Sequence, residues 1–206
     1  ASLLNAIYMW IDYNCGVRAY GGLPRLTEYL LLVLFDRVGF SPTLSQKLYF
    51  SLEYFIAGAS MYYLVSSVLQ NDSKRRLAGF LSGIVYMYNP YTVVYGATLW
   101  YGVIPFILGA YINGLARKSN TRYSIYIVVA FFATSTSFPT YSHIISTLIP
   151  PMLYTLLCVL WHELNIQKLW FGFKTLILLT VSNIWWLVPT WLTYPREYVS
   201  TLPLME

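Results

Sequence analysis

Residues 48–70 read LYFSLEYFIAGASMYYLVSSVLQ, and this stretch decides the class of the protein. As an α-helix, its about 23 residues would span roughly 34 Å, enough to cross the ~30 Å hydrocarbon core of a bilayer. Its one charged residue, Glu53, lies near the start, where the helix dipole favours a negative group. The gap NDSKRR at 71–76 then ends the apolar run with basic residues. We therefore predict a transmembrane helix over residues 48–70.

The composition of the whole chain agrees with this prediction. Of its 206 residues, 57% are hydrophobic and 10% are charged, whereas about 25% charged is usual in a soluble domain. So little charge cannot cover the surface of a soluble globule, which excludes a cytosolic enzyme. The abundant apolar residues exclude a disordered chain. Two cysteines are too few for a disulfide scaffold.

The remaining apolar stretches predict further crossings. Residues 77–116 are too long for one crossing, and we expect them to fold back at Asn89-Pro90, because proline disfavours helix in the residue before it. Residues 27–35 suit an interfacial or re-entrant helix. The other predicted crossings are 123–138, 144–161 and 169–192. The predicted fold is all-α: a polytopic transmembrane helix bundle of about six crossings plus one interfacial or re-entrant helix.

The basic residues predict the orientation of this bundle. They gather in gaps at 71–76, 117–122 and 162–168, and Lys174 lies one turn inside the last crossing, where it can snorkel back to the same side. If the crossings alternate, all three gaps share one face, which the positive-inside rule assigns to the cytoplasm.

Three regions follow from this orientation. Residues 1–47 form an extracytoplasmic loop with the interfacial helix, residues 48–192 form the bundle, and residues 193–206 form an extracytoplasmic tail. The scattered basic gaps do not form one stripe, so no nucleic-acid partner is expected.

Metal and cofactor motifs are absent from the sequence. His143 and His162 would lie about 28 Å apart along one helix, too far to bind one metal ion or one haem. No Cys-x-x-Cys, His-Glu-x-x-His, Gly-x-x-x-x-Gly-Lys-Ser/Thr or Gly-x-Ser-x-Gly pattern occurs. We therefore predict no metal centre and no bound cofactor. A divalent cation held by oxygen ligands such as Asp12 is the alternative left open.

The charges of the predicted outer loop are the candidate site. Asp12 directly follows Trp10 and Ile11, which places an acid at the expected membrane boundary, where it could accept a proton from a hydroxyl. Arg18 and Arg25 could bind phosphate oxygens through their planar guanidinium groups. His143, in the turn PTYSH on the same face, is a further candidate contact. The simpler interpretation is that these charges only solvate a loop.

Two stretches carry a resemblance to a known family. YMWIDYNCGVRAYGGLPR at 8–25 and YMYNPY at 86–91, with a basic gap before the second, resemble archaeal polytopic membrane proteins similar to arabinofuranosyltransferases. These have the C-type glycosyltransferase fold and take sugars from polyprenyl-phosphate carriers at the extracytoplasmic face. The resemblance extends to about residue 115. It implies that Asp12 matches the acid of the first outer loop and that Asn89 and Pro90 match a structural helix break.

The chain also departs from the family pattern. It has no paired Asp-x-Asp, no helix before the acid, and no extracytoplasmic domain after the last crossing. The resemblance therefore implies that this chain is the N-terminal part of a longer protein.

Two functions are open from the sequence. In the first, the chain is a C-type glycosyltransferase, or a fragment of one. Its partners are membrane lipid and a polyprenyl-phosphate sugar donor, Asp12 is the catalytic base or positions a metal ion, and Arg18, Arg25 and His143 bind the substrate phosphate. In the alternative, the chain is a non-catalytic transmembrane subunit of a larger membrane complex. Its aromatic belts and small residues would then dock other helices: Gly58, Ala59, Gly79 and Gly83. The sequence leaves open whether the chain is catalytic.

Overall fold

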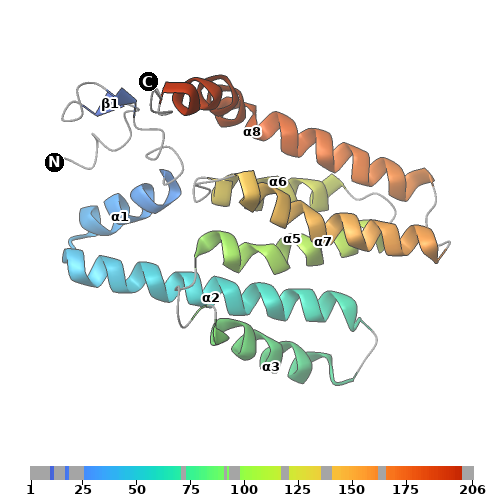
Figure 1. The fold of residues 1–206 in the computed structure, drawn as a ribbon. Coiled ribbons are helices and arrows are strands. Elements are labelled where there is room, and N and C mark those ends of the chain that lie inside the picture. The colour runs from blue at the N-terminus through green and yellow to red at the C-terminus, as the bar shows by residue number, and fades with distance from the viewer. Residues whose placement is uncertain are drawn as a thin grey trace.

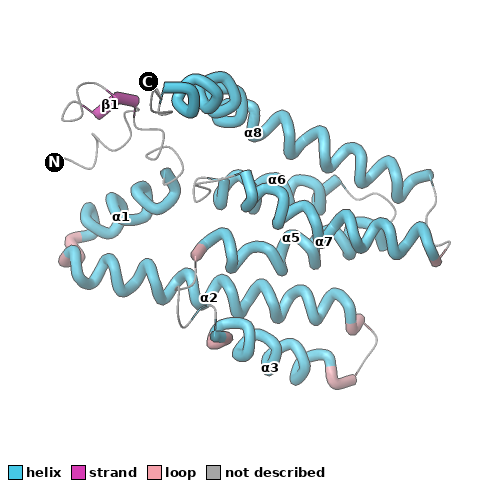
Figure 2. The backbone as a smooth tube through the Cα atoms, in the orientation of Figure 1, coloured by secondary structure: helices cyan, strands magenta, loops and turns pink. Residues whose placement is uncertain are grey.

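The computed structural model describes the backbone of residues 10–11, 17–18, 26–70, 73–90, 92, 98–116, 121–135, 141–161 and 166–200. Side chains are described for 30–70, 73–90, 92, 98–116, 121–133, 147–161, 166–182 and 184. Within these residues the protein is all-α apart from one short pair of strands, which confirms the all-α part of the predicted fold (Figures 1 and 2).

The described elements follow one another along the chain as two strands and seven helices. Strand β1 is Trp10–Ile11 and strand β2 is Val17–Arg18. The helices are α1 Leu26–Val38, α2 Pro42–Val68, α3 Arg75–Met87, α5 Leu99–Ala116, α6 Thr121–Ser135, α7 Tyr141–Leu160 and α8 Ile166–Ser200. The last six correspond to the six apolar stretches of the sequence.

The N-terminal region differs in detail from the sequence expectation. We predicted an irregular loop after Ile11, but β1 and β2 pair antiparallel, with Trp10 opposite Arg18 and Ile11 opposite Val17. Trp10, Ile11 and Val17 are of residue types that favour strands. Helix α1 extends beyond the predicted 27–35 at both ends.

Local signals in the sequence explain where α2 begins. Gly39 has a φ of +93°, a conformation that glycine adopts without strain, and it turns the chain after α1. The Ser41 hydroxyl accepts a hydrogen bond from the Leu44 N–H at 3.3 Å, and Pro42 occupies the first turn, where its missing N–H costs nothing. Helix α2 therefore starts ahead of the apolar run, at the Ser-Pro signal.

The predicted break at Asn89-Pro90 is confirmed. Helix α3 ends at Met87, and the Asn89 side chain holds the turn. Its amide donates to the Tyr86 carbonyl at 2.8 Å, and its Oδ1 accepts from the Thr92 N–H at 3.2 Å. One side chain thus satisfies backbone groups on both sides of the break, as asparagine does in turns.

Helices α2, α3 and α5 pack along one another in alternating directions. Gly58 of α2 faces Gly83 of α3, whereas Gly79, earlier in α3, faces Tyr62, later in α2, so these two helices are antiparallel. Helices α2 and α5 are parallel, because their first contact joins Glu53 to Leu99 and their last joins Gln70 to Asn113.

The other helices continue the alternation. Helices α5 and α7 are parallel, with hydrogen bonds from Trp100 to Thr147 and between Tyr111 and Thr155. Helices α6 and α8 are parallel to each other, with Ser124 bonded to Thr175. Phe171, near the start of α8, packs on Gly114 near the end of α5, so α8 runs against α5.

One end of the bundle therefore collects the three basic gaps. Helices α2, α5 and α7 finish there, and α3, α6 and α8 begin there (Figure 1). We call this the basic end; its described charges are Lys74, Arg75, Arg76, Arg122, Lys168 and Lys174. The other end, where α1 joins α2, is called the opposite end. Lys174 donates to the Thr121 hydroxyl at 2.9 Å, so its ammonium group reaches the first turn of α6.

The core is built around α5. Its buried Ile107, Ala110, Tyr111 and Leu115 meet α6 and α8, which contribute the remaining buried members Ile127, Phe131, Phe171 and Leu179. Among the described residues, α5 is the one helix long and apolar enough to cross a membrane by length and composition, and 61% of that stretch is buried. Helices α3 and α6, with 13 and 15 residues, are shorter than such a span, and serines and tyrosines lower the hydropathy of α2.

The C-terminal region also differs from expectation. We predicted a tail after residue 192, but α8 continues to Ser200. The change to polar residues therefore does not end the helix.

Candidate functional site

The side chains predicted as the site lie outside the described part of the structure. Asp12 and Arg25 are outside it altogether, and Arg18 and His143 are described only as backbone in β2 and α7. The structure does describe the backbone that surrounds Asp12 in sequence: Ile11, the residue before it, pairs with Val17, the residue before Arg18. It therefore brings together the strand that precedes the predicted acid and the strand that carries one predicted phosphate ligand.

A buried carboxylate marks the opposite end of the bundle. Glu53 is 4% exposed, and its Oε1 accepts a hydrogen bond from the Leu99 N–H at 3.1 Å. The first N–H groups of a helix have no partner within the helix, and the dipole gives them positive character. Glu53 of α2 thus caps the first turn of α5. The sequence predicted a capping role from its place near its own helix start, but the helix it caps lies 46 residues further on.

Tyrosines surround the turn between α3 and α5 at this end. Tyr86 and Tyr101 stack with ring centroids 4.4 Å apart and planes 5° from parallel, and the Tyr86 hydroxyl donates to the Tyr101 carbonyl at 2.9 Å. The Asn89 amide also donates to the Tyr101 hydroxyl. Tyr54 of α2 donates to the Thr92 carbonyl at 3.1 Å. The turn at Asn89-Pro90 is therefore a hydrogen-bonded junction of α2, α3 and α5.

A polar network lies near the basic end of the bundle. The Asn113 amide of α5 donates to the Tyr63 hydroxyl at 3.0 Å and to the Ser67 hydroxyl at 2.7 Å, and its Oδ1 accepts from the Gln70 amide at 3.1 Å. Asn113 and Ser67 are buried. The sequence contains no local signal for this network, because Asn113 lies more than 40 residues from each of its three partners.

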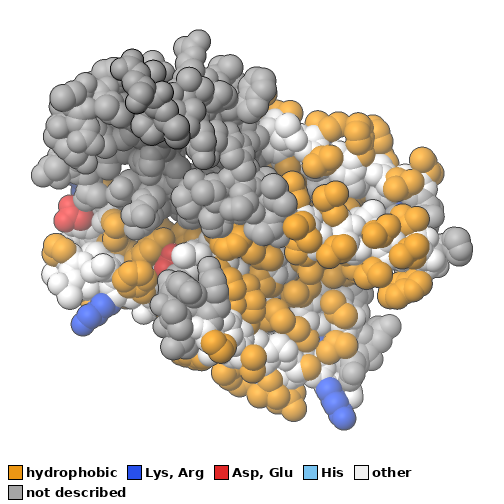
Figure 3. All heavy atoms as spheres, viewed as in Figure 1, with side chains coloured by type: hydrophobic (Ala, Val, Ile, Leu, Met, Phe, Trp, Pro, Cys, Tyr) orange, Lys and Arg blue, Asp and Glu red, His pale blue; other side chains and the backbone are white. Residues whose placement is uncertain are grey.

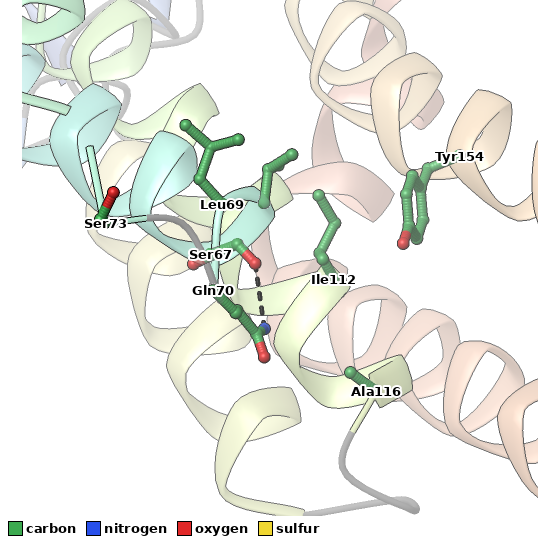
Figure 4. A pocket seen from close by; sticks show the side chains of 8 residues that line it. Ser67, Leu69, Gln70, Ser73, Ile112, Ala116 and Tyr154 are labelled. Atoms are coloured by element: carbon green, nitrogen blue, oxygen red, sulfur yellow. Dashed lines mark hydrogen bonds between the residues drawn. The ribbon is translucent and has the colours of Figure 1, made fainter. Parts of the chain in front are cut away.

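A pocket of about 820 Å³ opens beside this network, between the end of α2, the end of α5 and the middle of α7 (Figure 4). In Figure 4, Tyr154 of α7 faces Ile112 of α5 across the space, and Gln70 lies on the α2 side. The pocket has a mixed lining of hydroxyls, an amide and aliphatic groups: Ser67, Val68, Leu69, Gln70, Ser73, Ile112, Ala116 and Tyr154. Such a lining suits a ligand with both a polar and an apolar part.

The outer faces of the helices are apolar. Figure 3 shows hydrophobic side chains spread over much of the described surface on one face of the molecule. On α7, Met152 is 68% exposed and Leu160 is 62% exposed, and neighbouring leucines and Val159 are exposed too. Similar rows lie on α3, with Leu77, Phe80, Leu81, Ile84 and Val85, and on α8, with Leu169, Trp170, Phe173, Leu176, Ile177, Val181 and Ile184. A soluble monomer rarely exposes so large a contiguous apolar surface.

The predicted docking face of small residues is used inside the chain. A Cβ on Gly83 would come within 2.9 Å of the Gly58 carbonyl oxygen, and one on Gly79 would come within 2.9 Å of the Tyr62 ring. These glycines thus allow α2 and α3 to approach closely. Of the four small residues, Ala59 alone is exposed.

No cluster of three or more His, Cys, Asp or Glu side chains that could hold a metal ion occurs among the described residues. Cys158, on α7, is a buried free thiol. A ligand could instead be bound by hydrogen bonds from the hydroxyl and amide groups of the pocket and by the positive charges of the basic end.

Comparison with protein-family models, with curated proteins and with solved structures finds no match to this chain.

Proposed function

We propose that this chain is a polytopic membrane protein and that it acts as a C-type glycosyltransferase, or as part of one. It would take a sugar from a polyprenyl-phosphate carrier at the extracytoplasmic face.

The observation that carries the membrane assignment is the exposed apolar surface between the two ends. In water, each exposed leucine or phenylalanine side chain forgoes about 1.5–3 kcal/mol that burial would gain, and more than thirty large hydrophobic side chains are exposed. In a bilayer the same surface is matched by lipid chains. The six described charges of the basic end are all positive, as expected of a cytoplasmic face.

Exposed aromatic residues at the basic end support the same assignment. Trp161 directly follows α7, Trp170 lies in the second turn of α8, and Tyr126 lies in the second turn of α6. All three are exposed. Tryptophan and tyrosine favour the boundary between lipid and water because their rings are amphipathic. The six helices α2, α3, α5, α6, α7 and α8 would then be the six crossings, tilted or shortened where they have fewer than about 20 residues.

The catalytic part of the proposal places the reaction at the opposite end. The strand pair β1–β2 precedes α1, and α1 joins α2 at that end, away from the basic gaps (Figure 1). Asp12 would act as the base that takes a proton from the acceptor hydroxyl, or would position a divalent cation. Arg18 and Arg25, with His143, would bind the donor phosphate.

The test compares two acids of the N-terminal region in the native protein in membranes. Asp12→Asn is expected to lower sugar transfer from a polyprenyl-phosphate donor by at least about 100-fold. Asp36→Asn is the matched control, because Asp36 is an exposed acid of α1 that the mechanism does not use, and it should leave transfer unchanged. Equal transfer by wild type and Asp12→Asn would remove Asp12 from the mechanism.

The alternative, a non-catalytic transmembrane subunit, has less support from the geometry. Its predicted docking face contains Gly58, Gly79 and Gly83, which pack between α2 and α3 of this same chain. A stoichiometric membrane partner that co-purifies after mild detergent extraction, from a preparation without transferase activity, would favour this alternative over the enzyme.

A further inference from the structure

We infer that the pocket at the basic end binds the headgroup of an anionic phospholipid of the cytoplasmic leaflet. The inference rests on the proposed insertion in a membrane but concerns a different site from the proposed transferase centre.

The position of the pocket excludes it from the proposed transfer reaction. Its lining residues come from the last turn of α2 and the residues after it, from the end of α5, and from Tyr154 of α7. All of these lie toward the basic end, whereas β1, β2 and α1 precede α2 at the opposite end. About two thirds of α5, or roughly 18 Å, separates the pocket from the first turn of that helix. A ligand in this pocket would therefore lie at the cytoplasmic surface of the bilayer, whereas the proposed transfer reaction takes place at the extracytoplasmic surface.

The lining has the two halves that a phospholipid needs. Ser73 and Tyr154 offer hydroxyl groups that can donate to phosphate oxygens, and Ser73 is exposed beside the basic gap. Leu69, Ile112 and Ala116 offer an aliphatic wall. The volume of about 820 Å³ is that of a small-molecule site and would hold a glycerophosphate headgroup with the start of its chains.

Charge next to the pocket selects an anionic headgroup. Ser73 is followed directly by Lys74, Arg75 and Arg76, all exposed, and these three cations outnumber Asp72, the one acid of the gap 71–76. Each such cation near a membrane surface contributes about 1 kcal/mol toward anionic lipid, and basic pockets between transmembrane helices bind anionic headgroups. Arginine is especially suited to phosphate because its guanidinium group donates two parallel hydrogen bonds.

The outer surface of α7 provides a path for the lipid chains. Leu153 and Leu157 flank Tyr154 on this helix and are both exposed, and Trp161 is exposed where α7 ends. A lipid with its phosphate at Ser73 could lay its chains along this face, toward the middle of the bilayer. The pocket lies between α2 and α7, two helices that share no extensive contact.

The amide network holds the pocket wall in place. Gln70 donates to the Ser67 carbonyl at 3.0 Å and to Asn113, so its amide group is fixed at the rim. The wall is thus pre-formed, which lowers the ordering cost of binding.

The experiment measures lipid binding by the native protein purified in mild detergent. We expect phosphatidylglycerol to raise the melting temperature more than phosphatidylcholine does. Replacing both Arg75 and Arg76 by Gln should weaken phosphatidylglycerol binding about 25-fold, or about fivefold for each charge. Arg122→Gln is the control: it removes an exposed arginine of α6 at the same end, whereas Arg75 and Arg76 closely follow the pocket residue Ser73 in sequence, and it should weaken binding by less than about fivefold.

Two further variants test the pocket rather than the surface charge. Ala116→Trp fills the space, and Tyr154→Phe removes one hydroxyl donor with little change in volume. We expect the first to abolish selective stabilisation by phosphatidylglycerol and the second to weaken it severalfold. If the tryptophan variant does not fold, the Tyr154→Phe variant still decides the question.

Three results would overturn the inference. The first is equal stabilisation by phosphatidylglycerol and phosphatidylcholine. The second is selectivity for phosphatidylglycerol that persists in both pocket variants, which would mean that the selectivity comes from diffuse surface charge. The third is an equal rise in melting temperature with soluble glycerol phosphate, which would mean that the pocket binds a free phosphate compound and not a lipid. If alkaline carbonate releases the protein from native membranes, the membrane assignment itself fails. A protein that stays in the membrane but shows no lipid selectivity refutes only the pocket inference.

Discussion

The carboxylate of Glu53 accepts a hydrogen bond from the backbone N–H of Leu99 at 3.1 Å, and this contact joins the middle of α2 to the first turn of α5. Because Glu53 is buried, the contact gains strength from a low dielectric, and losing it would leave a buried donor without this acceptor. The two helices make the most extensive contact of any pair in the bundle. The register of α2 against α5 is therefore fixed at one end by the Glu53–Leu99 hydrogen bond and at the other by the hydrogen bonds of Asn113.

Replacing Glu53 by leucine should destabilise the protein by about 2–3 kcal/mol, since it removes a helix cap and leaves a buried N–H unpaired. Glu53→Gln keeps an acceptor oxygen and loses only the charge, so we expect a smaller loss, about 1 kcal/mol. Thermal or denaturant unfolding in detergent would measure both. Phe55→Leu, on the exposed side of the same helix, is the control and should change stability little. Equal losses of unfolding free energy in the Glu53→Leu and Glu53→Gln variants would show that the helix cap is not the source of the stabilisation.

The two glycines where α2 crosses α3 should differ in their tolerance of alanine. A Cβ on Gly83 would lie 2.9 Å from the Gly58 carbonyl oxygen, so backbone must move, at a cost of about 1–3 kcal/mol. A Cβ on Gly58 meets the flexible end of the Met87 side chain, which can turn away. Gly83→Ala should therefore destabilise more than Gly58→Ala in the same unfolding assay. Ala59→Val, on the exposed side of α2, is the control, and the reverse order of the two glycine variants would contradict this packing.

The amide network predicts a measurable coupling between two helices. Asn113→Ala and Gln70→Ala each remove the hydrogen bond between the two amides, so their combined effect should be smaller than the sum of the single effects. We expect a coupling of about 0.5–1.5 kcal/mol, the range of hydrogen bonds between membrane helices. A double-mutant cycle on unfolding free energies measures it. Additivity within error would mean that the two side chains act independently.

The sequence predicted the turns better than the contacts between helices. Asn89-Pro90 and the three basic gaps are local signals, because proline disfavours helix in the residue before it and clustered charge is disfavoured inside a buried helix; Pro105, inside α5, shows that packing can override the first signal. Helix α2 begins at Ser41-Pro42 for an equally local reason. The partner of Glu53 could not be predicted in this way, because Leu99 is brought to it only by the packing of α5 on α2.

The contacts of the small residues could not be predicted from the sequence either. A row of glycines indicates close helix approach but not which helix approaches. The sequence left Gly58 and Gly83 available for another chain, whereas the fold uses each as the other's neighbour. Among the candidate site residues, the backbone pairing of Trp10 with Arg18 was unforeseen for a similar reason, since a two-residue strand is too short to produce a period in the sequence.

The alternation of the helices predicts on which side of a membrane each end lies. Ser73 is exposed at the basic end, and Thr43 is exposed in the first turn of α2 at the opposite end. In a background with Cys15→Ser and Cys158→Ala, an impermeant thiol reagent applied to intact cells should label Thr43→Cys and leave Ser73→Cys unlabelled until the membrane is opened. The two sites lie about 40 Å apart along α2, so a bilayer fits between them. Labelling of both sites in intact cells would refute the membrane assignment, and labelling of Ser73→Cys alone would place the basic end outside, against the positive-inside rule.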